Sequence, residues 1–215
     1  LKALLSVSKL TDTPQLTAED VGIGLAPRIN AAGRLGQARL AVELLTTSDS
    51  ERAVSLADYV DQLNNNRKTV ERRIFKAAGE MIDRHPEWED HPTLVLADHQ
   101  WHPGVIGIVA SRIKDEFSRP AIIISFDEDG VGKGSARSIP KLNLYDALSH
   151  ASEFLEGFGG HPMAAGLTVH KSKFEFFKSQ FLNIKDVLKC LTNLKSCQIF
   201  SVKKGINAVS YTHLR

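Results

Sequence analysis

Two glycine-rich segments carry the residue types that bind phosphate. Residues 157–166 read Gly-Phe-Gly-Gly-His-Pro-Met-Ala-Ala-Gly, and residues 132–138 read Gly-Lys-Gly-Ser-Ala-Arg-Ser. Glycine lets a backbone approach a ligand closely, and Arg, Lys, Ser and free N–H groups together suit a phosphate oxyanion. We interpret the segments as two loops that wall one phosphate site. The groups expected to contact it are Lys133, Ser135, Arg137, Ser138, Gly159, Gly160 and His161.

Each segment also has a purely structural interpretation. Two glycines between a helix and a strand are typical of a helix C-cap followed by a turn. Residues 132–138 alone could equally form a solvated strand. The presence of both segments in one short domain favours the phosphate site.

A third loop, residues 98–103, connects a predicted strand to a predicted helix. Ligands gather at the carboxyl ends of strands and at helix N-termini in such folds. His102 could therefore hydrogen-bond a phosphate, or could instead cap or pack the helix. His161 follows two glycines and has little nearby to bury it, which favours contact with a ligand.

The sequence lacks a complete set of catalytic groups. No His-Glu-x-x-His motif occurs, and residues 127–130 are better explained as a turn between two strands than as a metal site. Ser135 and Ser138 lack the Gly-x-Ser-x-Gly context of a nucleophile. We predict phosphate binding and no metal ligand within this chain.

Composition is that of a soluble globular protein. The 215 residues are 42% hydrophobic and 24% charged, and the net charge of +2 gives no global signal for nucleic acid. No apolar run reaches the roughly 18 residues of a membrane span. Cys190 and Cys197 lack a C-x-x-C spacing, so we expect free thiols and a cytoplasmic protein. Leu1 in place of Met suggests a fragment.

The predicted elements divide the chain into four parts. Residues 1–47 are short helices broken by turns, and 48–86 hold one long helix with a 3–4 apolar alternation. Residues 87–184 alternate strands with helices, which predicts an α/β domain with a mixed, at least partly parallel sheet flanked by helices. Residues 185–215 are an uncertain tail whose end resembles a translated sequencing adapter, and we assign it no function.

Two features of the helical half have alternative interpretations. The cations Arg28, Arg34 and Arg39 surround a Pro- and Gly-containing corner, which is either solvated or a contact surface for a phosphate backbone. In the long helix, Asn64-Asn65-Asn66-Arg67 interrupts the apolar seam. That interruption predicts a solvent-exposed midpoint facing a cleft, or equally a frayed surface face.

Taken in order, five motifs resemble one family. They are Pro-Arg-Ile-Asn-Ala-Ala-Gly-Arg, the Asn-Asn-Asn-Arg of the long helix, Trp-His-Pro-Gly-Val-Ile-Gly-Ile-Val-Ala-Ser-Arg, Lys-Gly-Ser-Ala-Arg-Ser and Gly-Gly-His-Pro-Met-Ala-Ala-Gly, at 27–34, 64–67, 101–112, 133–138 and 159–166. Together they resemble the RecJ family of single-stranded-DNA-specific exonucleases, in the DHH/DHHA1 phosphoesterase superfamily. The resemblance covers about residues 1–183.

The resemblance implies a 5′-to-3′ exonuclease of recombination and repair. In this family a DHH domain holds two Mn²⁺ or Mg²⁺ ions on Asp and His ligands, and a long helix joins it to a DHHA1 domain. DNA threads the cleft between them. Residues 1–47 would then be the helical end of the DHH domain, and 87–184 the DHHA1 domain. The implied partners are single-stranded DNA with a 5′ end and other repair proteins, with no membrane.

The resemblance also assigns roles to residues. Ser135, Arg137 and Ser138 would hold the terminal phosphate. The segment Gly159-Gly160-His161 would face the metals and the scissile phosphate, with His161 as the catalytic group. The route of the strand would be lined by Arg28, Asn30 and Arg34.

Two departures from the family pattern affect these expectations. Ala136 stands where the family usually has Gly, and its Cβ is expected to tighten the loop or shift the arginine. The Asp-His-His motif and the other metal ligands are absent, so we expect this chain alone neither to bind the metal pair nor to hydrolyse DNA. Two alternatives stay open: a phosphodiesterase for oligonucleotides or cyclic dinucleotides, and a non-catalytic nucleic-acid-binding module. The long helix argues against the first.

Overall fold

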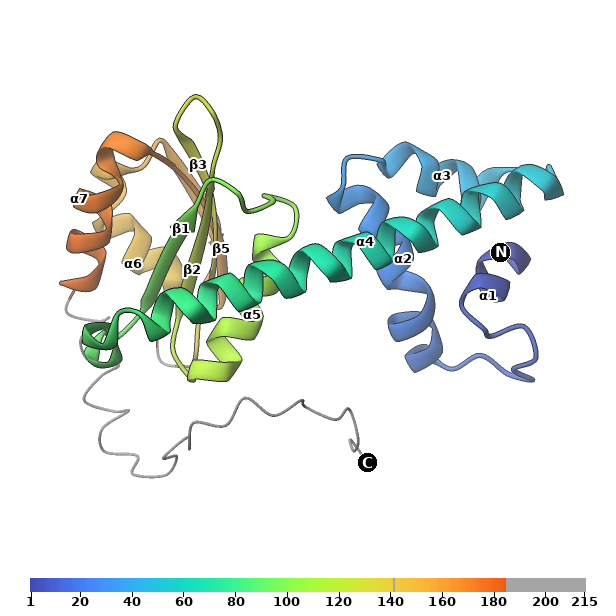
Figure 1. Ribbon diagram of the computed structural model, residues 1–215, viewed down its shortest axis with the longest axis horizontal. Coiled ribbons are helices and arrows are strands. Elements are labelled where there is room, and N and C mark those ends of the chain that lie inside the picture. The colour runs from blue at the N-terminus through green and yellow to red at the C-terminus, as the bar shows by residue number, and fades with distance from the viewer. Residues whose placement is uncertain (141, 185–215) are drawn as a thin grey trace.

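A computed structural model describes residues 1–140 and 142–184. The chain begins with a cluster of short helices, continues into one long helix, and ends in a five-stranded sheet with helices on both faces (Figure 1). The first cluster consists of α1 (Lys2–Val7), the π-helix η1 (Asp20–Leu25), α2 (Ala26–Arg34) and α3 (Ala38–Thr46). No helix in the described ranges combines the length and apolar character that a membrane span requires.

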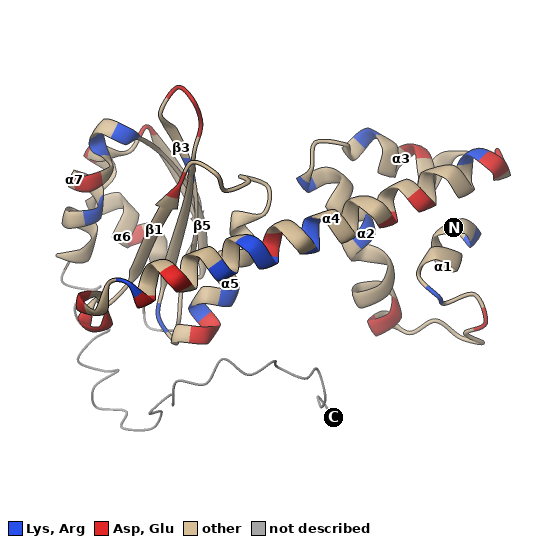
Figure 2. Cartoon of the chain, in the orientation of Figure 1, with Lys and Arg blue, Asp and Glu red and all other residues tan. Residues whose placement is uncertain are grey.

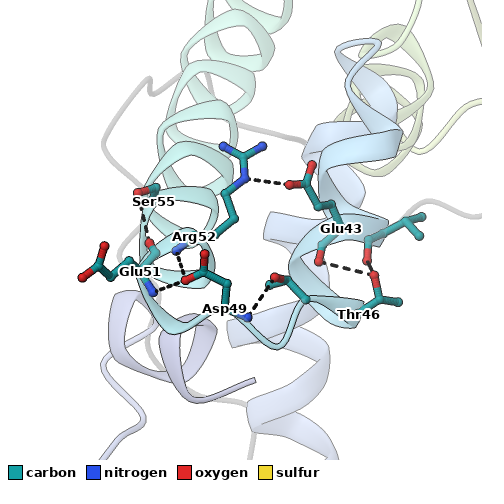
Figure 3. Close-up of polar contacts among 8 residues, drawn as sticks. Glu43, Thr46, Asp49, Glu51, Arg52 and Ser55 are labelled. Carbon is teal, nitrogen blue, oxygen red and sulfur yellow. Dashed lines mark hydrogen bonds and ion pairs between the residues drawn. The ribbon is translucent and has the colours of Figure 1, made fainter.

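The long helix α4 (Ser50–Asp83) connects the two parts of the molecule without a break (Figure 1). Its 34 residues correspond to roughly 50 Å. Asp49 caps it, because its Oδ1 accepts hydrogen bonds from the backbone N–H groups of Glu51 at 2.9 Å and Arg52 at 3.1 Å (Figure 3). The long helix predicted within residues 48–86 is thus confirmed, from Ser50 to Asp83.

The two halves of α4 are buried in different cores. Leu56, Ala57 and Val60 pack with α1, α2 and α3, whereas Ile74 and Ala78 pack with α5 (Ile106–Phe117) and one face of the sheet. The helix is therefore a shared element of both parts and does not act as a solvated spacer.

The polar interruption in the middle of α4 is only partly exposed: Asn65 and Asn66 are exposed, as expected, whereas Asn64 and Arg67 are not. The helix continues through it without fraying. Asn64 is 1% exposed and accepts a hydrogen bond from Arg67. Arg67 also pairs with Glu71 at 2.7 Å, and the other carboxylate oxygen of Glu71 accepts from Arg112 of α5 at 3.1 Å. Burying these groups is tolerated because each charge meets an opposite charge or a hydrogen-bond partner.

The sheet is mixed, as predicted. Its strand order is β1-β2-β3-β5-β4, in which only β1 and β2 run parallel among the described pairs. The bounds are β1 (Leu94–Asp98), β2 (Ala121–Phe126), β3 (Val131–Arg137), β4 (Gly157–His161) and β5 (Ala164–His170).

One predicted loop is a strand. Residues 157–160 belong to β4, which pairs with β5 at the edge of the sheet. Glycine is required at Gly160, where φ is 150° and a Cβ would overlap the carbonyl oxygen of Ala164. The glycines that resemble a turn in the sequence therefore serve a close strand pairing.

The helices cover the two faces of the sheet unequally. A buried apolar cluster joins β2, β3 and β5 to α6 (Leu144–His150) and α7 (Lys171–Leu182) on one face. On the opposite face α4 and α5 pack against β1, β2 and β3, while the glycines of β4 and β5 there are exposed. The uncertain tail predicted at 185–215 lies outside the described residues.

A close contact joins the helical cluster to the sheet. The guanidinium of Arg34, the last residue of α2, donates a hydrogen bond to the carbonyl oxygen of Gly104 at 3.1 Å. In return Gly104 packs so tightly on α2 that a Cβ there would overlap the carbonyl oxygen of Arg34. Leu35 follows, and packs against the core of α4, α5 and the sheet.

Because of this contact, a single methyl group added at Gly104 should destabilise the protein. Gly104→Ala should lower the free energy of unfolding by about 1–3 kcal/mol, because the added Cβ meets backbone that must move. Urea denaturation measures the change. The matched control is Gly79→Ala in α4, where nothing lies within 4 Å of the new Cβ. There we expect about 0.5–1 kcal/mol of stabilisation, and equal effects at both positions would contradict the tight contact.

Candidate nucleic-acid interface

A groove of about 800 Å³ lies between the helical cluster and the sheet. One wall comes from α2 and α3, and the other comes from β3 and the segment that leads into α5. Its lining residues are Ile29, Asn30, Gly33, Arg34, Ala38, Ala41, Val42, Leu45, Pro103, Gly104, Ile106, Gly107, Lys133, Gly134, Ser135 and Arg137.

Two guanidinium groups meet in this groove. Arg137 is half-buried, and its Nη1 donates hydrogen bonds to Ser135 Oγ at 2.9 Å and to the carbonyl oxygen of Ala136 at 2.8 Å. Burial, and then the neighbouring charge of Arg34, lower the pKa of Arg137. The ion pairs of residues 1–140 and 142–184 include neither arginine. Two cations held together without a carboxylate form a site for an anion.

The first turn of α5 adds to this positive wall. Its N-cap, Val105, supplies no side-chain hydrogen bond to the helix, so the positive end of the helix dipole faces the groove through Ile106 and Gly107. A Cβ at Gly107 would lie 3.1 Å from Ser135 Oγ and 3.2 Å from Arg137 Nη2. Glycine at this position thus lets the helix end touch the side chains of β3.

The electrostatic attraction of an anion to the groove comes from nearby residues and not from the charge of the whole chain. Figure 2 shows acidic and basic residues interspersed along α4, which agrees with the small net charge of +2. Lys133 is exposed on β3 at the groove, beside Arg137 and on the same side of the strand. An anion is therefore drawn to this part of the surface by a few converging groups.

The opposite wall contains residues that the sequence analysis missed. Ala38, Val42 and Leu45 of α3 lie at i, i+4 and i+7 and line the groove. Val42 is 61% exposed and Leu45 is 52% exposed. Their spacing is visible in the sequence, as a second apolar stripe beside the buried one of Ala41 and Leu44.

Five of the eleven predicted site residues line the groove, and six do not. Asn30, Arg34, Lys133, Ser135 and Arg137 line it. Ser138 is 1% exposed, and its hydroxyl donates to the carbonyl oxygen of Leu142 at 2.7 Å, which argues against direct contact with a phosphate. Arg28, His102, Gly159, Gly160 and His161 are also absent from the lining.

Arg28 and His102 are engaged in holding the fold. The side chain of Arg28 pairs with Asp61 at 2.7 Å and also donates to the carbonyl oxygens of Gly24 and Val7. These bonds tie α2 to α4 and α1, and they occupy the guanidinium. His102 Nδ1 accepts a hydrogen bond from the backbone N–H of Gly104 at 3.1 Å, within the loop that precedes α5, and no side chain caps that helix.

The two glycine segments do not wall one pocket, because β5 separates β3 from β4. They do share one face of the sheet. In the antiparallel register Arg137 pairs with Ala164 and Ala164 with His161, so these three side chains lie in one row on the same face. Two strand spacings put the row's ends about 10 Å apart. Gly159 lies in the next row with Gly166 and Ser135, on an exposed floor of backbone.

The methyl group of Ala136, where the sequence departs from the family pattern, points away from the groove. Its side chain is fully buried in the cluster that includes Ile122 and Leu167, on the face covered by α6 and α7. Alternation along β3 turns this Cβ away from the groove. The methyl group therefore fills the core and leaves Ser135 and Arg137 free to face the groove.

The described residues offer no metal centre. In residues 1–140 and 142–184 no group of three or more His, Cys, Asp and Glu side chains could hold an ion. This part of the chain therefore does not fit the ligand set of a metal pair.

Comparison with known proteins matches these features to one family. A family profile described as "DHHA1 domain" matches residues 90–185. The single-stranded-DNA-specific exonuclease RecJ of Bacillus subtilis is 43% identical over 187 residues, which cover 86% of this chain and 23% of the relative. RecJ of Escherichia coli is 40% identical over 187 residues, covering 84% of this chain and 32% of the relative.

Solved structures agree. RecJ from Thermus thermophilus in complex with Mg²⁺ has a TM-score of 0.72 at 34% identity, over 84% of this chain and 28% of that one. A structure of exonuclease RecJ bound to manganese has a TM-score of 0.70 at 32% identity, and the match covers 87% of this chain and 47% of that one. The chain spans about a quarter to a third of the length of the curated relatives it matches. With its DHHA1 domain, and with its sequence and fold matching one segment of these exonucleases, the chain belongs to the RecJ family.

Proposed function

We propose that this chain is the substrate-binding part of a 5′-to-3′ single-stranded-DNA exonuclease that acts in recombination and repair in the cytoplasm. The observation that carries the proposal is that Arg34 and Arg137 lie near each other in one groove. Neither arginine forms an ion pair with a carboxylate of the described residues. The relatives that match the chain are named single-stranded-DNA-specific exonucleases. Single-stranded DNA with a 5′ end is the proposed partner, and other repair proteins would associate with the whole enzyme.

The terminal phosphate of the strand would lie between the two arginines. Each guanidinium can donate two parallel hydrogen bonds to phosphate oxygens. Ser135 Oγ lies at the same place and can reorient its proton toward an oxygen. The first turn of α5 adds the positive end of the helix dipole beside these side chains. A 5′-terminal phosphate carries more negative charge than an internal diester, so a site of two cations favours the end of the strand.

His161 would act further along the strand. It is exposed on the same sheet face as Arg137, at the end of a row whose middle residue is only alanine. Beside it the floor made by Gly159 and Gly166 lets a ligand approach the backbone closely. We assign His161 to the neighbourhood of the scissile phosphate, with Gly160 holding the tight pairing that orients it.

Metal chemistry belongs to residues that the described part does not contain. The Thermus thermophilus structures hold Mg²⁺ or Mn²⁺, which supplies an activated water in two-metal hydrolysis. The described residues lack a ligand set that fits such an ion. Their contribution is to bind the strand and to position its end.

Removing one guanidinium should weaken binding and reduce its salt dependence. We expect Arg137→Ala to lower the affinity for a 5′-phosphorylated single strand about tenfold or more at low salt, because charge-assisted hydrogen bonds are lost. The slope of log K against log salt should fall by about 0.7. Fluorescence anisotropy with a labelled oligonucleotide at several salt concentrations measures both. Arg84→Ala, at the far end of α4, is the matched control and should change neither quantity. An unchanged affinity in Arg137→Ala would contradict the assignment of a phosphate site to β3.

The two arginines should also set the preference for a phosphorylated end. The parent chain is expected to bind a 5′-phosphorylated strand more tightly than the same strand with a 5′-hydroxyl. Arg34→Ala and Arg137→Ala should each reduce that ratio, because both cations face one anion. Competition between the two oligonucleotides gives the ratio directly. A ratio of one in the parent chain would restrict the site to internal phosphates.

The purified chain should bind DNA without cutting it. With Mn²⁺ and a labelled single strand we expect no release of nucleotides, because the described residues lack a metal-ligand set. Gel analysis of the products measures this. Release that requires Mn²⁺ and stops on addition of EDTA would contradict the expectation, whereas release that EDTA leaves unchanged identifies a contaminating nuclease.

A further inference from the structure

Helix α3 has two apolar faces, and only one of them is buried. Ala41 and Leu44 pack against α4 in the core of the helical cluster. On the adjacent face Ala38, Val42 and Leu45 form a continuous stripe along the helix, and Val42 and Leu45 are 61% and 52% exposed. A continuous apolar stripe beside charged groups is typical of a surface that binds a ligand, whereas scattered single apolar residues are not.

The orientation of the stripe is fixed by contacts at the other side of α3. Glu43 pairs with Arg52 of α4 at 2.6 Å, and Asp49 caps α4 directly after the connecting turn (Figure 3). The hydroxyl of Thr46 donates to the carbonyl oxygen of Val42 at 3.0 Å, within the last turns of α3. The Glu43–Arg52 pair joins α3 to α4, and Ala41 and Leu44 are buried in the core that includes α4, so the stripe on the adjacent face lines the groove.

The two walls of the groove are chemically different. Across from the stripe lie Lys133, Ser135 and Arg137, with Arg34 at the end of α2. A ligand that matches both walls needs anions along one side and apolar surface along the other. A single-stranded nucleic acid has this arrangement, because its phosphates and its unpaired bases point in different directions. A duplex does not, since it stacks its bases inside and presents phosphates outward.

We propose that Val42 and Leu45 are the contact surface for the bases of the bound strand, while β3 and α5 hold its phosphates. This inference rests on the proposed function and adds the orientation of the strand within the groove. Aliphatic side chains offer no hydrogen bonds to base edges, so the contact is tolerant of sequence. The stripe thereby selects strands with accessible bases over paired ones.

The test compares a strand that has bases with one that lacks them. The probes are a 5′-phosphorylated mixed-sequence oligonucleotide and a 5′-phosphorylated abasic oligomer of equal length. We expect Val42→Ser/Leu45→Ser to weaken binding of the base-bearing strand about tenfold, because it removes the apolar area that the bases cover. Binding of the abasic strand should stay unchanged. Val54→Ser, at an exposed valine of α4 that does not line the groove, is the matched control and should affect neither strand.

Each other outcome has a definite meaning. An equal loss for both strands, or no loss for either, overturns the base contact. A polyglutamate peptide that competes as well as the base-bearing strand overturns it too, because the groove would then bind any extended polyanion. Arg137→Ala separates this inference from the proposed function: if it leaves both strands bound as before, the phosphate site itself fails. Leu45→Asn alone, with urea denaturation of every variant, guards against a loss that comes from unfolding.

Discussion

The separation of the two walls of the groove is set where Gly104 meets the carbonyl oxygen of Arg34. A Cβ at Gly104 would overlap that oxygen, so only glycine allows the end of α2 to sit directly on the loop that precedes α5. The same residues also share a hydrogen bond from the guanidinium of Arg34 to the carbonyl oxygen of Gly104. One contact thus joins the helical cluster to the sheet and brings the charge of Arg34 beside Arg137.

The positive charge of Arg137 is unfavourable in the folded protein when no ligand is bound. Arg137 is partly removed from water and lies near a second cation, and both effects lower its pKa. Elsewhere the protein treats buried charge differently: Glu71 lies between Arg67 and Arg112, and Arg28 is paired with Asp61. The arginines with carboxylate partners stabilise the fold, whereas Arg34 and Arg137 have no such partner in the described ion pairs and can bind an anion. An anion that binds here also stabilises the fold, because it supplies the missing negative charge.

The sequence reveals α4 well, because its apolar spacing, the Asp49 cap and His85-Pro86 are local signals. It misleads over 157–160, where glycines resemble a turn and the pairing with β5 is a contact between separate segments. For the same reason Arg67 looks like a break in the seam until Glu71 and Arg112 are seen around it. In the site, residue types alone pointed to Ser135 and Arg137. They could not distinguish Arg34 from Arg28, because the difference is a carboxylate 33 residues away.

The continuity of α4 restricts how the molecule can change during evolution. The two cores share this one helix, so helical backbone rather than a flexible linker joins them. Adding one residue near its middle would rotate the helical cluster about the sheet by about 100° and would carry both arginines of the groove out of register. An insertion of a whole turn would keep the rotation but would move the two cores about 5.4 Å apart, which would separate Gly104 from Arg34 and widen the groove. Loops elsewhere can drift in length, but the number of residues between the two cores is tied to the helical repeat.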